Sequence, residues 1–287
     1  MQLLFNGVAL GAAYALVSLG FVLVVNATGA VNFAHGDLVM AGGYAAIVLA
    51  SRLSLPLLAV LPLVGAVTFV LGVVICVVAY FPLLKRPPST VFISTLLCGI
   101  ILENVYIVAF GPQAQAAPPL IAAGAVQIGP VQVSIQLVAT ILVATVLVGL
   151  QYLVFFRSQL GRRLHAVSED RDIARALGIP ALTMIAATFG LGSALAGIAG
   201  AILANQFFVS PGGGVSLSLT GYIAVVIGGW GSIPGAVAGA MLIALFPVLA
   251  SAVMPYTVAT ACLYAVLILI LFVRPRGLFG ERVQRRI

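Results

Sequence analysis

Few residues in this chain could do chemistry, and most of the charged ones lie in one stretch. Only 7% of the 287 residues are charged, yet the stretch from Arg157 to Pro180 holds five arginines and three acidic residues. They are Arg157, Arg162, Arg163, Arg171, Arg175, Glu169, Asp170 and Asp172. Long apolar runs flank this stretch on both sides, so it must lie in water or against a soluble partner. The sequence has no paired acids and no Ser/His arrangement, so we predict no catalytic residue and no enzymatic activity.

The pattern of this charged stretch predicts a short helix, roughly Glu169 to Leu177. Ser168 is placed to cap it, and the acids that follow favour the positive end of the helix dipole. Gly178 is a natural terminator, because it adopts left-handed backbone angles without strain. The apolar residues of this helix share one face, and they are Ile173, Ala176 and Leu177. Asp172 and Arg175 are spaced for an ion pair. The helix could dock into a groove on a soluble protein, or it could be a solvated loop helix that only fixes topology.

A second group of polar residues lies in or beside the apolar runs. Asn32, His35 and Asp37 interrupt the first apolar runs, and Glu103 and Asn104 lie inside a later one. A charge near the centre of a bilayer costs about 2.5–3.5 kcal/mol on insertion scales, so such groups should face a protein interior, a water path or the interface. Asp37 and His35 should lie near the end of a span, where Asp37 could start a helix or contact a substrate. Glu103 could contact a substrate or form a structural hydrogen bond. The two histidines are too isolated to indicate a metal site, and none is predicted.

Glycines are also candidates for the translocation pathway, together with the polar residues Asn32, His35, Asp37, Glu103 and Asn104. Small residues recur every four positions in two later spans, which allows helices to approach closely and to shear. They are Gly192, Ala196 and Gly200 in one span and Gly231, Gly235 and Gly239 in the other. Static packing alone is the simpler explanation for any single glycine. We include Gly229, Gly231 and Gly235 among the candidates because they surround a break in the helix pattern.

The elements that must position these residues are membrane-spanning helices. With 63% hydrophobic residues, the chain is far less polar than a soluble domain, about a quarter of which is charged. Runs of roughly 20 apolar residues recur throughout, and each is long enough to cross a bilayer as a helix. Because lipid offers no partner for backbone groups, an all-α polytopic bundle is predicted. We expect about nine spans, or eight if one short apolar piece is re-entrant.

The basic residues predict the topology. Lys85 and Arg86, the charged stretch and the tail after Arg274 satisfy the positive-inside rule if all three are cytoplasmic. The N-terminus would then lie outside and the C-terminus in the cytoplasm. No Lys or Arg precedes the first span, so no cleavable signal peptide is expected. The net charge of +7 is explained by topology and does not point to nucleic acid.

The chain is predicted to be one transmembrane domain of two halves. Residues 1–156 and 181–273 form the halves, 157–180 the loop between them, and 274–287 a basic cytoplasmic tail. Val31–Gly43 and Val215–Gly229 both run from a polar start to a paired glycine, and they are five spans apart in the predicted order. An odd number of spans would insert them in opposite directions, as in the inverted repeats whose interface forms a transport site. Chance similarity between glycine-rich helices is the alternative.

Four segments carry a resemblance to a known family. Gly161 to Ile179 resembles the cytoplasmic coupling loop of the inner-membrane permeases of ABC importers for branched-chain amino acids. Asn32-Phe-Ala-His-Gly-Asp37 with Met40-Ala-Gly-Gly-Tyr44 is similar to the N-terminal signature of the LivH-type subunit. Gly228 to Gly235 resembles the glycine-rich C-terminal motif, and Arg274 to Phe279 the family's usual end.

The resemblance implies a division of labour between several proteins. A second, related permease subunit or a second copy of this one would complete the membrane channel. Two cytoplasmic ATPase subunits would hold ATP and Mg, and a periplasmic protein would deliver the cargo; this chain would bind no cofactor. The sequence agrees, since it lacks the G-x-x-x-x-G-K-[ST] phosphate loop. The residues expected to couple to the ATPases are Gly161, Arg162, His165, Glu169, Asp170, Asp172, Ile173, Ala174, Leu177 and Gly178. Ala174 and Gly178 match small positions, where bulk would block docking.

The function expected on this basis is inward transport of branched-chain or similar apolar amino acids across a bacterial inner membrane by alternating access. The same machine could instead carry urea, short amides or another small polar solute. A rival of another class is an ion-coupled carrier or channel that uses Asp37 or Glu103 as a proton site.

Overall fold

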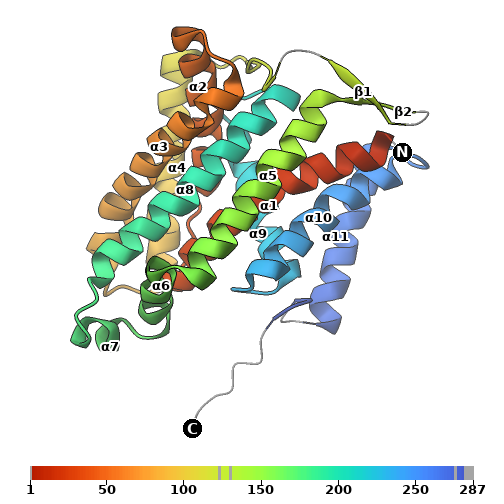
Figure 1. Cartoon of the computed structure of the whole chain (residues 1–287). Coiled ribbons are helices and arrows are strands. Elements are labelled where there is room, and N and C mark those ends of the chain that lie inside the picture. The colour runs from red at the N-terminus through yellow and green to blue at the C-terminus, as the bar shows by residue number, and fades with distance from the viewer. Residues whose placement is uncertain (1, 122–123, 129–130, 275–276, 281–287) are drawn as a thin grey trace.

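The computed structural model describes residues 2–121, 124–128, 131–274 and 277–280. Figure 1 shows a bundle that is almost wholly helical. The first half contains α1 (Gln2–Thr28), α2 (His35–Leu53), α3 (Leu57–Ile75) continued by η1 (Cys76–Tyr80) and η2 (Phe81–Leu83), α4 (Pro88–Phe110), the hairpin β1 (Ala125–Ile128) and β2 (Val131–Ser134), and α5 (Ile135–Arg157). The remainder contains α6 (Gln159–Glu169), α7 (Arg171–Ala176), α8 (Ala181–Gln206), α9 (Gly213–Gly228), α10 (Ile233–Ala250) and α11 (Tyr256–Val273).

The helices confirm the predicted class. Among the described residues, eight helices are long and apolar enough to cross a membrane, counting α3 with its continuation η1 and η2. The ninth apolar helix, α9, has only 16 residues. The choice between eight and nine spans therefore rests on α9, which is too short to cross alone.

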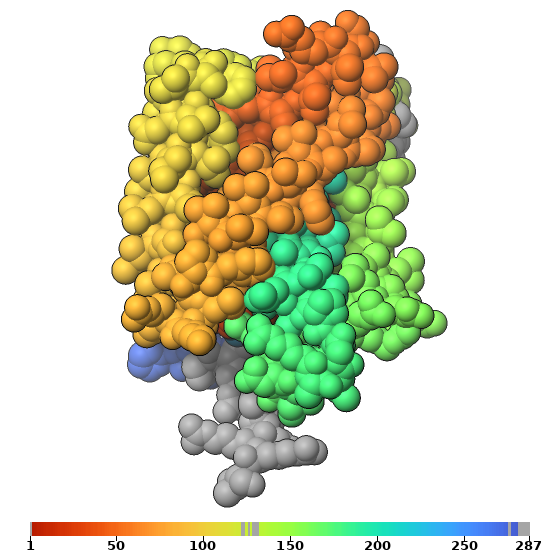
Figure 2. Space-filling view, turned by 90° about the vertical axis from the view of Figure 1, so that its left-hand side faces the viewer, coloured from red at the N-terminus to blue at the C-terminus, as the bar shows by residue number. Residues whose placement is uncertain are grey.

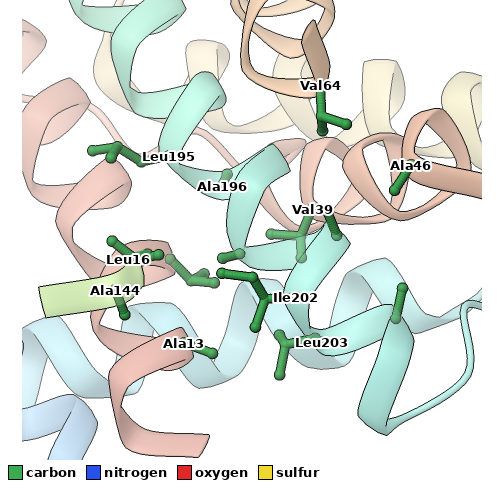
Figure 3. Packing of buried hydrophobic residues seen from close by; sticks show 14 of the residues in the cluster. Ala13, Leu16, Val39, Ala46, Val64, Ala144, Leu195, Ala196, Ile202 and Leu203 are labelled. Atoms are coloured by element: carbon green, nitrogen blue, oxygen red, sulfur yellow. The ribbon is translucent and has the colours of Figure 1, made fainter. Parts of the chain in front are cut away.

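Helix α1 forms the centre of the bundle. In its most apolar window 89% of the residues are buried, against 11% in α11 at the periphery. It packs mainly against α10, α8 and α5. Figure 3 shows the middle of this core, where Leu16 of α1 lies near Ile202 of α8 and Ala144 of α5. Aliphatic and small side chains fill this region, which lets the helices approach closely.

Glycines bring α2 and α8 into backbone contact. A Cβ on Gly42 would overlap the main chain of Gly197, and one on Gly200 would overlap the carbonyl of Val39. Gly42 and Gly43 therefore lie inside α2, which continues to Leu53. The paired glycine of this segment thus lies inside its helix, whereas the helix of the corresponding segment, α9, ends at Gly228.

The helix contacts follow the pattern that an inverted repeat would give. Helix α1 packs most closely with α10, and α8 with α3. Helix α2 contacts α3 as α9 contacts α10, and α2 and α9 contact one another. Exchanging α1, α2 and α3 for α8, α9 and α10 leaves this set of contacts unchanged. The division of the chain into two halves remains a prediction that these contacts favour.

The two ends of the bundle differ. The start of α1 and the β1–β2 hairpin lie at the upper end of Figure 1, and α6 and α7 lie at the lower end. Figure 2, which looks onto α3 and α4, shows the green segment around α7 at the same lower end. The outer faces of α3 and α4 carry exposed aliphatic side chains such as Val70, Val78 and Ile101. Such a surface suits contact with lipid.

Candidate functional site

The charged stretch forms two helices, where one was predicted. Helix α6 runs to Glu169, and Asp170 breaks the chain with extended angles (φ −154°, ψ 117°) before α7 begins. Asp170 Oδ1 accepts hydrogen bonds from the backbone N–H groups of Asp172 (2.8 Å) and Ile173 (2.9 Å). The predicted cap, Ser168, is wrong, because it lies inside α6 and its hydroxyl donates to the carbonyl of His165. Ser and Asp are both favoured N-cap residues. The helix break at Asp170 makes Asp170, and not Ser168, the cap of α7.

The predicted end of the helix is confirmed. Gly178 has a φ of 78°, the left-handed angle that closes a helix. Its N–H donates to the carbonyl of Arg175, and the next N–H, of Ile179, donates to the carbonyl of Ala174. A side chain at Gly178 would be strained by the backbone angle itself. Gly161 is also fixed by the fold, since a Cβ there would overlap the carbonyls of Val154 and Phe155.

Helix α7 has one face on the bundle and one face in solvent. Ala174 is 1% exposed and packs in the cluster around Ile185 of α8, so bulk at Ala174 would disturb this chain's own core. Ile173 and Leu177 are 61% and 74% exposed. The face available to a partner is therefore Ile173 with Leu177, and Ala174 is an anchor. Ile173 and Leu177 are the two large residues of the apolar face that the sequence predicted.

The charged residues around α7 are solvated. Arg175 and Asp172 pair at 3.8 Å as predicted, and His165 lies 4.0 Å from Glu169, but all four side chains are at least half exposed. Surface pairs of this kind contribute about 0–1 kcal/mol. Arg162 is also exposed, with its guanidinium near the carbonyl of Arg157. These groups are placed to meet a partner and do little to hold the fold.

Arg171 holds α7 to the membrane part, a role that the sequence did not reveal. Its guanidinium donates to the carbonyls of Thr28 (2.8 Å) and Ala27 (3.4 Å) at the end of α1. It also lies 5.7 Å from the ring centre of Tyr80. A cation at the end of a helix is stabilised by the helix dipole. Among five arginines in the stretch, only the position of α1 in space singles this one out.

The start of α2 is buried inside the bundle, beside the middle part of α1. His35 is fully buried, stacks on Phe21 and makes a 3.0 Å hydrogen bond through Nε2 to the carbonyl of Val17. Val17 lies 11 residues before Thr28, which is about 16 Å along a helix. The expectation that His35 and Asp37 lie near a span end is right for the helix and wrong for the depth. Residues 29–34 lead the chain back into the bundle before α2 begins.

Helices α2 and α9 meet at their N-terminal ends. The N–H of Gly36 donates to the hydroxyl of Ser218 (2.7 Å), which donates to the carbonyl of Phe33 (3.0 Å). A Cβ on Gly36 would overlap the carbonyl of Gly214 in the first turn of α9. From there α9 runs to the end of α1, where Asn26 donates to the carbonyl of Gly231 (3.0 Å). Helices α2 and α9 thus start from one buried point inside the bundle, as the discontinuous helices of transporters do.

Asp37 and Glu103 line one cavity of about 110 Å³ beside this point. Asp37 is 4% exposed and lies in the first turn of α2, and its carboxylate lines the cavity. Glu103 projects from α4 and is half-buried. The remaining wall residues are Phe33, Leu96, Gly99, Ile100, Val215, Ser218 and Leu219. Here the fold brings together two predicted pathway residues from different helices, Asp37 of α2 and Glu103 of α4.

The other predicted pathway residues lie elsewhere. Asn104 is exposed on the outer side of α4, where its amide donates to the carbonyl of Ile100 in its own helix (2.7 Å). Asn32 is buried beside α2, and its Oδ1 accepts from the N–H of Ala34 (3.1 Å). Both therefore have local structural roles. Neither lines the cavity of Asp37 and Glu103.

The glycines near residue 230 form the joint between α9 and α10. Gly229 and Gly231 have positive φ angles of 119° and 82°. A Cβ on Gly235 would overlap the carbonyl of Gly228 across the joint. The segment after Gly277 pairs with the same joint, since the N–H of Phe279 donates to the carbonyl of Gly228 (2.8 Å). These glycines are explained by turn geometry and close packing.

In and around the cavity lie residues that the sequence did not indicate. Gly99 and Gly214 leave room for the Asp37 carboxylate, since a Cβ on either would overlap it. Tyr106 donates its hydroxyl hydrogen to the main-chain oxygen of Asp37 (3.1 Å). Ser218 of α9 is remote in sequence from α2 and α4, so only the fold reveals its place. The spacing of Gly99, Glu103 and Tyr106 on one face of α4 is the signal that could have found part of this group.

Comparison with known proteins adds the family. The family described as branched-chain amino acid transport system / permease component matches residues 3–273. The high-affinity branched-chain amino acid transport system permease protein BraD of Pseudomonas aeruginosa is 31% identical over 297 residues, covering 98% of this chain and 96% of BraD. LivH of Escherichia coli K12 is 33% identical over 295 residues, with the same coverage. A probable LivH of Methanocaldococcus jannaschii is 26% identical and covers 80% of this chain and 74% of its own length.

A solved structure overlaps more distantly. PsaBC from Streptococcus pneumoniae in complex with Fab matches with a TM-score of 0.49 and 16% identity, covering 96% of this chain and 93% of the other. The sequence identity to LivH and BraD is about twice as high, and the family match covers residues 3–273. This chain belongs to the branched-chain amino acid transport permease family.

Proposed function

We propose that this chain is a membrane-spanning permease subunit of an ATP-driven ABC importer, and that it moves branched-chain amino acids inward by alternating access. The relatives named above are permease proteins of branched-chain amino acid systems, which favours this cargo over urea or short amides. The chain would sit in a bacterial inner membrane with its N-terminus periplasmic and its C-terminus cytoplasmic. The end that carries α6, α7 and Arg274 would then face the cytoplasm, as the positive-inside rule requires.

The observation that carries this proposal is the construction of α7. Its Ile173–Leu177 face is exposed, while Ala174 and Arg171 bind it to the bundle. A surface helix with an exposed apolar face and a rigid attachment can transmit a push from a partner to the membrane helices. We infer that each of two cytoplasmic ATPase subunits holds ATP and Mg and docks on such a helix. A second, related permease or a second copy would supply the other α7, and a periplasmic protein would deliver the cargo.

The docking assignment can be tested with two substitutions on this face. Ile173→Asp and Leu177→Asp should each lower co-purification of the ATPase subunits and ATP-dependent leucine uptake by about tenfold or more, as loss of a central interface anchor does. Both side chains are exposed, so the permease itself should remain folded. Val253→Asp is the matched control, because Val253 is 83% exposed in the loop after α10, at the other end of the molecule. Full ATPase binding by both α7 variants would refute the assignment.

The energy source separates the importer from an ion-coupled carrier. In vesicles that contain the complete complex and the binding protein, uptake should persist with a proton ionophore while ATP lasts and should stop when ATP is depleted. The opposite outcome would support a carrier that uses Asp37 or Glu103 as a proton site.

A further inference from the structure

Asp37 and Glu103 line the same cavity, and among the described residues neither forms an ion pair. The ion pairs of the described residues lie in α6 and α7. The neighbouring hydroxyl groups are engaged elsewhere, since Tyr106 donates to the Asp37 main-chain oxygen and Ser218 donates to the carbonyl of Phe33. An acidic group inside a membrane protein is costly without a compensating partner. A cationic group from outside the chain would supply that partner.

The walls of the cavity restrict what that cationic group can belong to. Most of the lining is apolar, and its apolar side chains are Phe33, Leu96, Ile100, Val215 and Leu219. Val215 and Leu219 are also exposed, at 60% and 46%, so the cavity opens between α4 and α9. A cavity of about 110 Å³ has room for several water-sized groups. The cavity therefore suits a small ammonium group whose aliphatic part extends along the open side.

The glycines around Asp37 show that the space is built into the fold. Gly99 of α4 and Gly214 of α9 are the two positions at which a Cβ would overlap the Asp37 carboxylate. They keep that carboxylate at the cavity wall and free of side-chain cover. The N-terminal ends of α2 and α9 meet here, and their dipoles stabilise negative charge at this depth.

We propose that this cavity is a station on the transport path, where Asp37 and Glu103 bind the α-ammonium group of the amino-acid cargo. The inference rests on the proposed function, because it takes the cargo to be a branched-chain amino acid. It assigns to the permease itself a weak contact with the one cationic group that all such amino acids share. The aliphatic side chain lies against Val215 and Leu219 and needs no specific polar contact.

Protection of an introduced thiol tests the station without any turnover. Val215→Cys is placed in the full chain after Cys76, Cys98 and Cys262 are replaced by Ala, and the assembled transporter is labelled with a neutral maleimide in the absence of ATP. L-Leucine and 3-methylbutylamine, which both carry the ammonium group, should slow labelling several-fold. 4-Methylpentanoate, which is leucine without its ammonium group, should not. Val108→Cys, on the outer face of α4 and 88% exposed, should show no protection.

Neutral versions of the acids complete the test. Asp37→Asn and Glu103→Gln should each raise the concentration of 3-methylbutylamine needed for half-protection by about tenfold or more, as loss of a charge-assisted contact does. Glu103 is half-buried, so Glu103→Gln keeps the test valid if Asp37→Asn fails to fold. Equal protection by 4-methylpentanoate, protection by Na⁺ alone, or no protection by leucine would each overturn the proposal. ATP-dependent uptake of leucine is measured separately, and its absence would count against the proposed function instead.

Discussion

At the scale of single residues, small side chains determine how closely the helices pack. The sequence predicted close contacts at Gly192, Gly200 and Gly235 from their four-residue spacing. All three lie against the main chain of a neighbouring helix. The same spacing cannot tell which glycines are essential. Gly42 and Gly149 both lie inside helices, yet a Cβ on Gly42 would overlap Gly197 and one on Gly149 would meet nothing within 4 Å. That difference depends on the neighbouring helix, which no local pattern contains.

Gly42→Ala and Gly149→Ala should therefore act in opposite directions. Gly42→Ala must push α2 away from α8, so the midpoint of thermal unfolding in detergent should fall by several degrees. Gly149→Ala should leave the midpoint unchanged or raise it slightly, because Ala stabilises an open helix position by roughly 0.5–1 kcal/mol over Gly. Equal midpoints for the two variants would show that the α2–α8 contact is not as tight as described.

Arg171 and Arg175 offer a second contrast at this scale. Arg171→Ala removes the hydrogen bonds to Thr28 and Ala27 and should destabilise the chain by about 1–3 kcal/mol. Arg175→Ala removes only an exposed pair with Asp172 and should change stability by less than about 0.5 kcal/mol. Denaturation of both variants, followed by fluorescence of Trp230, provides the comparison. A larger loss for Arg175→Ala would contradict the anchoring role of Arg171.

At the scale of elements, the sequence located the helices well and their depth poorly. The apolar runs predicted about nine spans, and the structure has eight long helices and the shorter α9, because helix is the structure that satisfies the backbone in lipid. The starts of α2 and α9 are different, since both lie deep in the bundle. Whether a polar interruption lies at the surface or returns into the bundle depends on contacts such as His35 with Val17. For the same reason Asp37 and Glu103 were singled out separately, and their shared cavity could not be predicted.

The cap of α7 is the element-scale feature most open to test. Asp170 accepts the first backbone hydrogen bonds of α7, so Asp170→Ala should destabilise the helix by about 1 kcal/mol. Asp170→Asn should leave it intact, because Asn caps as well as Asp. If α7 transmits the push of an ATPase, Asp170→Ala should lower leucine uptake per ATP hydrolysed and Asp170→Asn should not. Equal uptake ratios for the two variants would count against a rigid α7.

At the scale of the whole molecule, the positive-inside rule makes a prediction about both ends. Leu177 and Val253 are exposed at opposite ends of the bundle. In intact cells, a membrane-impermeant maleimide should label a Val253→Cys variant and leave a Leu177→Cys variant unlabelled until the membrane is opened. Labelling of the Leu177→Cys variant in intact cells would reverse the orientation. The charge pattern allowed this prediction, because orientation depends on loop composition and not on packing.

The central position of α1 has a consequence for biogenesis. It leaves the ribosome well before α10, and of the described spans it is the most enclosed in the finished bundle. Its glycines Gly7 and Gly11 face Leu245 and Met241 of α10. The glycine face of α1 therefore stays uncovered by α10 until that helix has been made, so the packing of α1 is completed only late in synthesis.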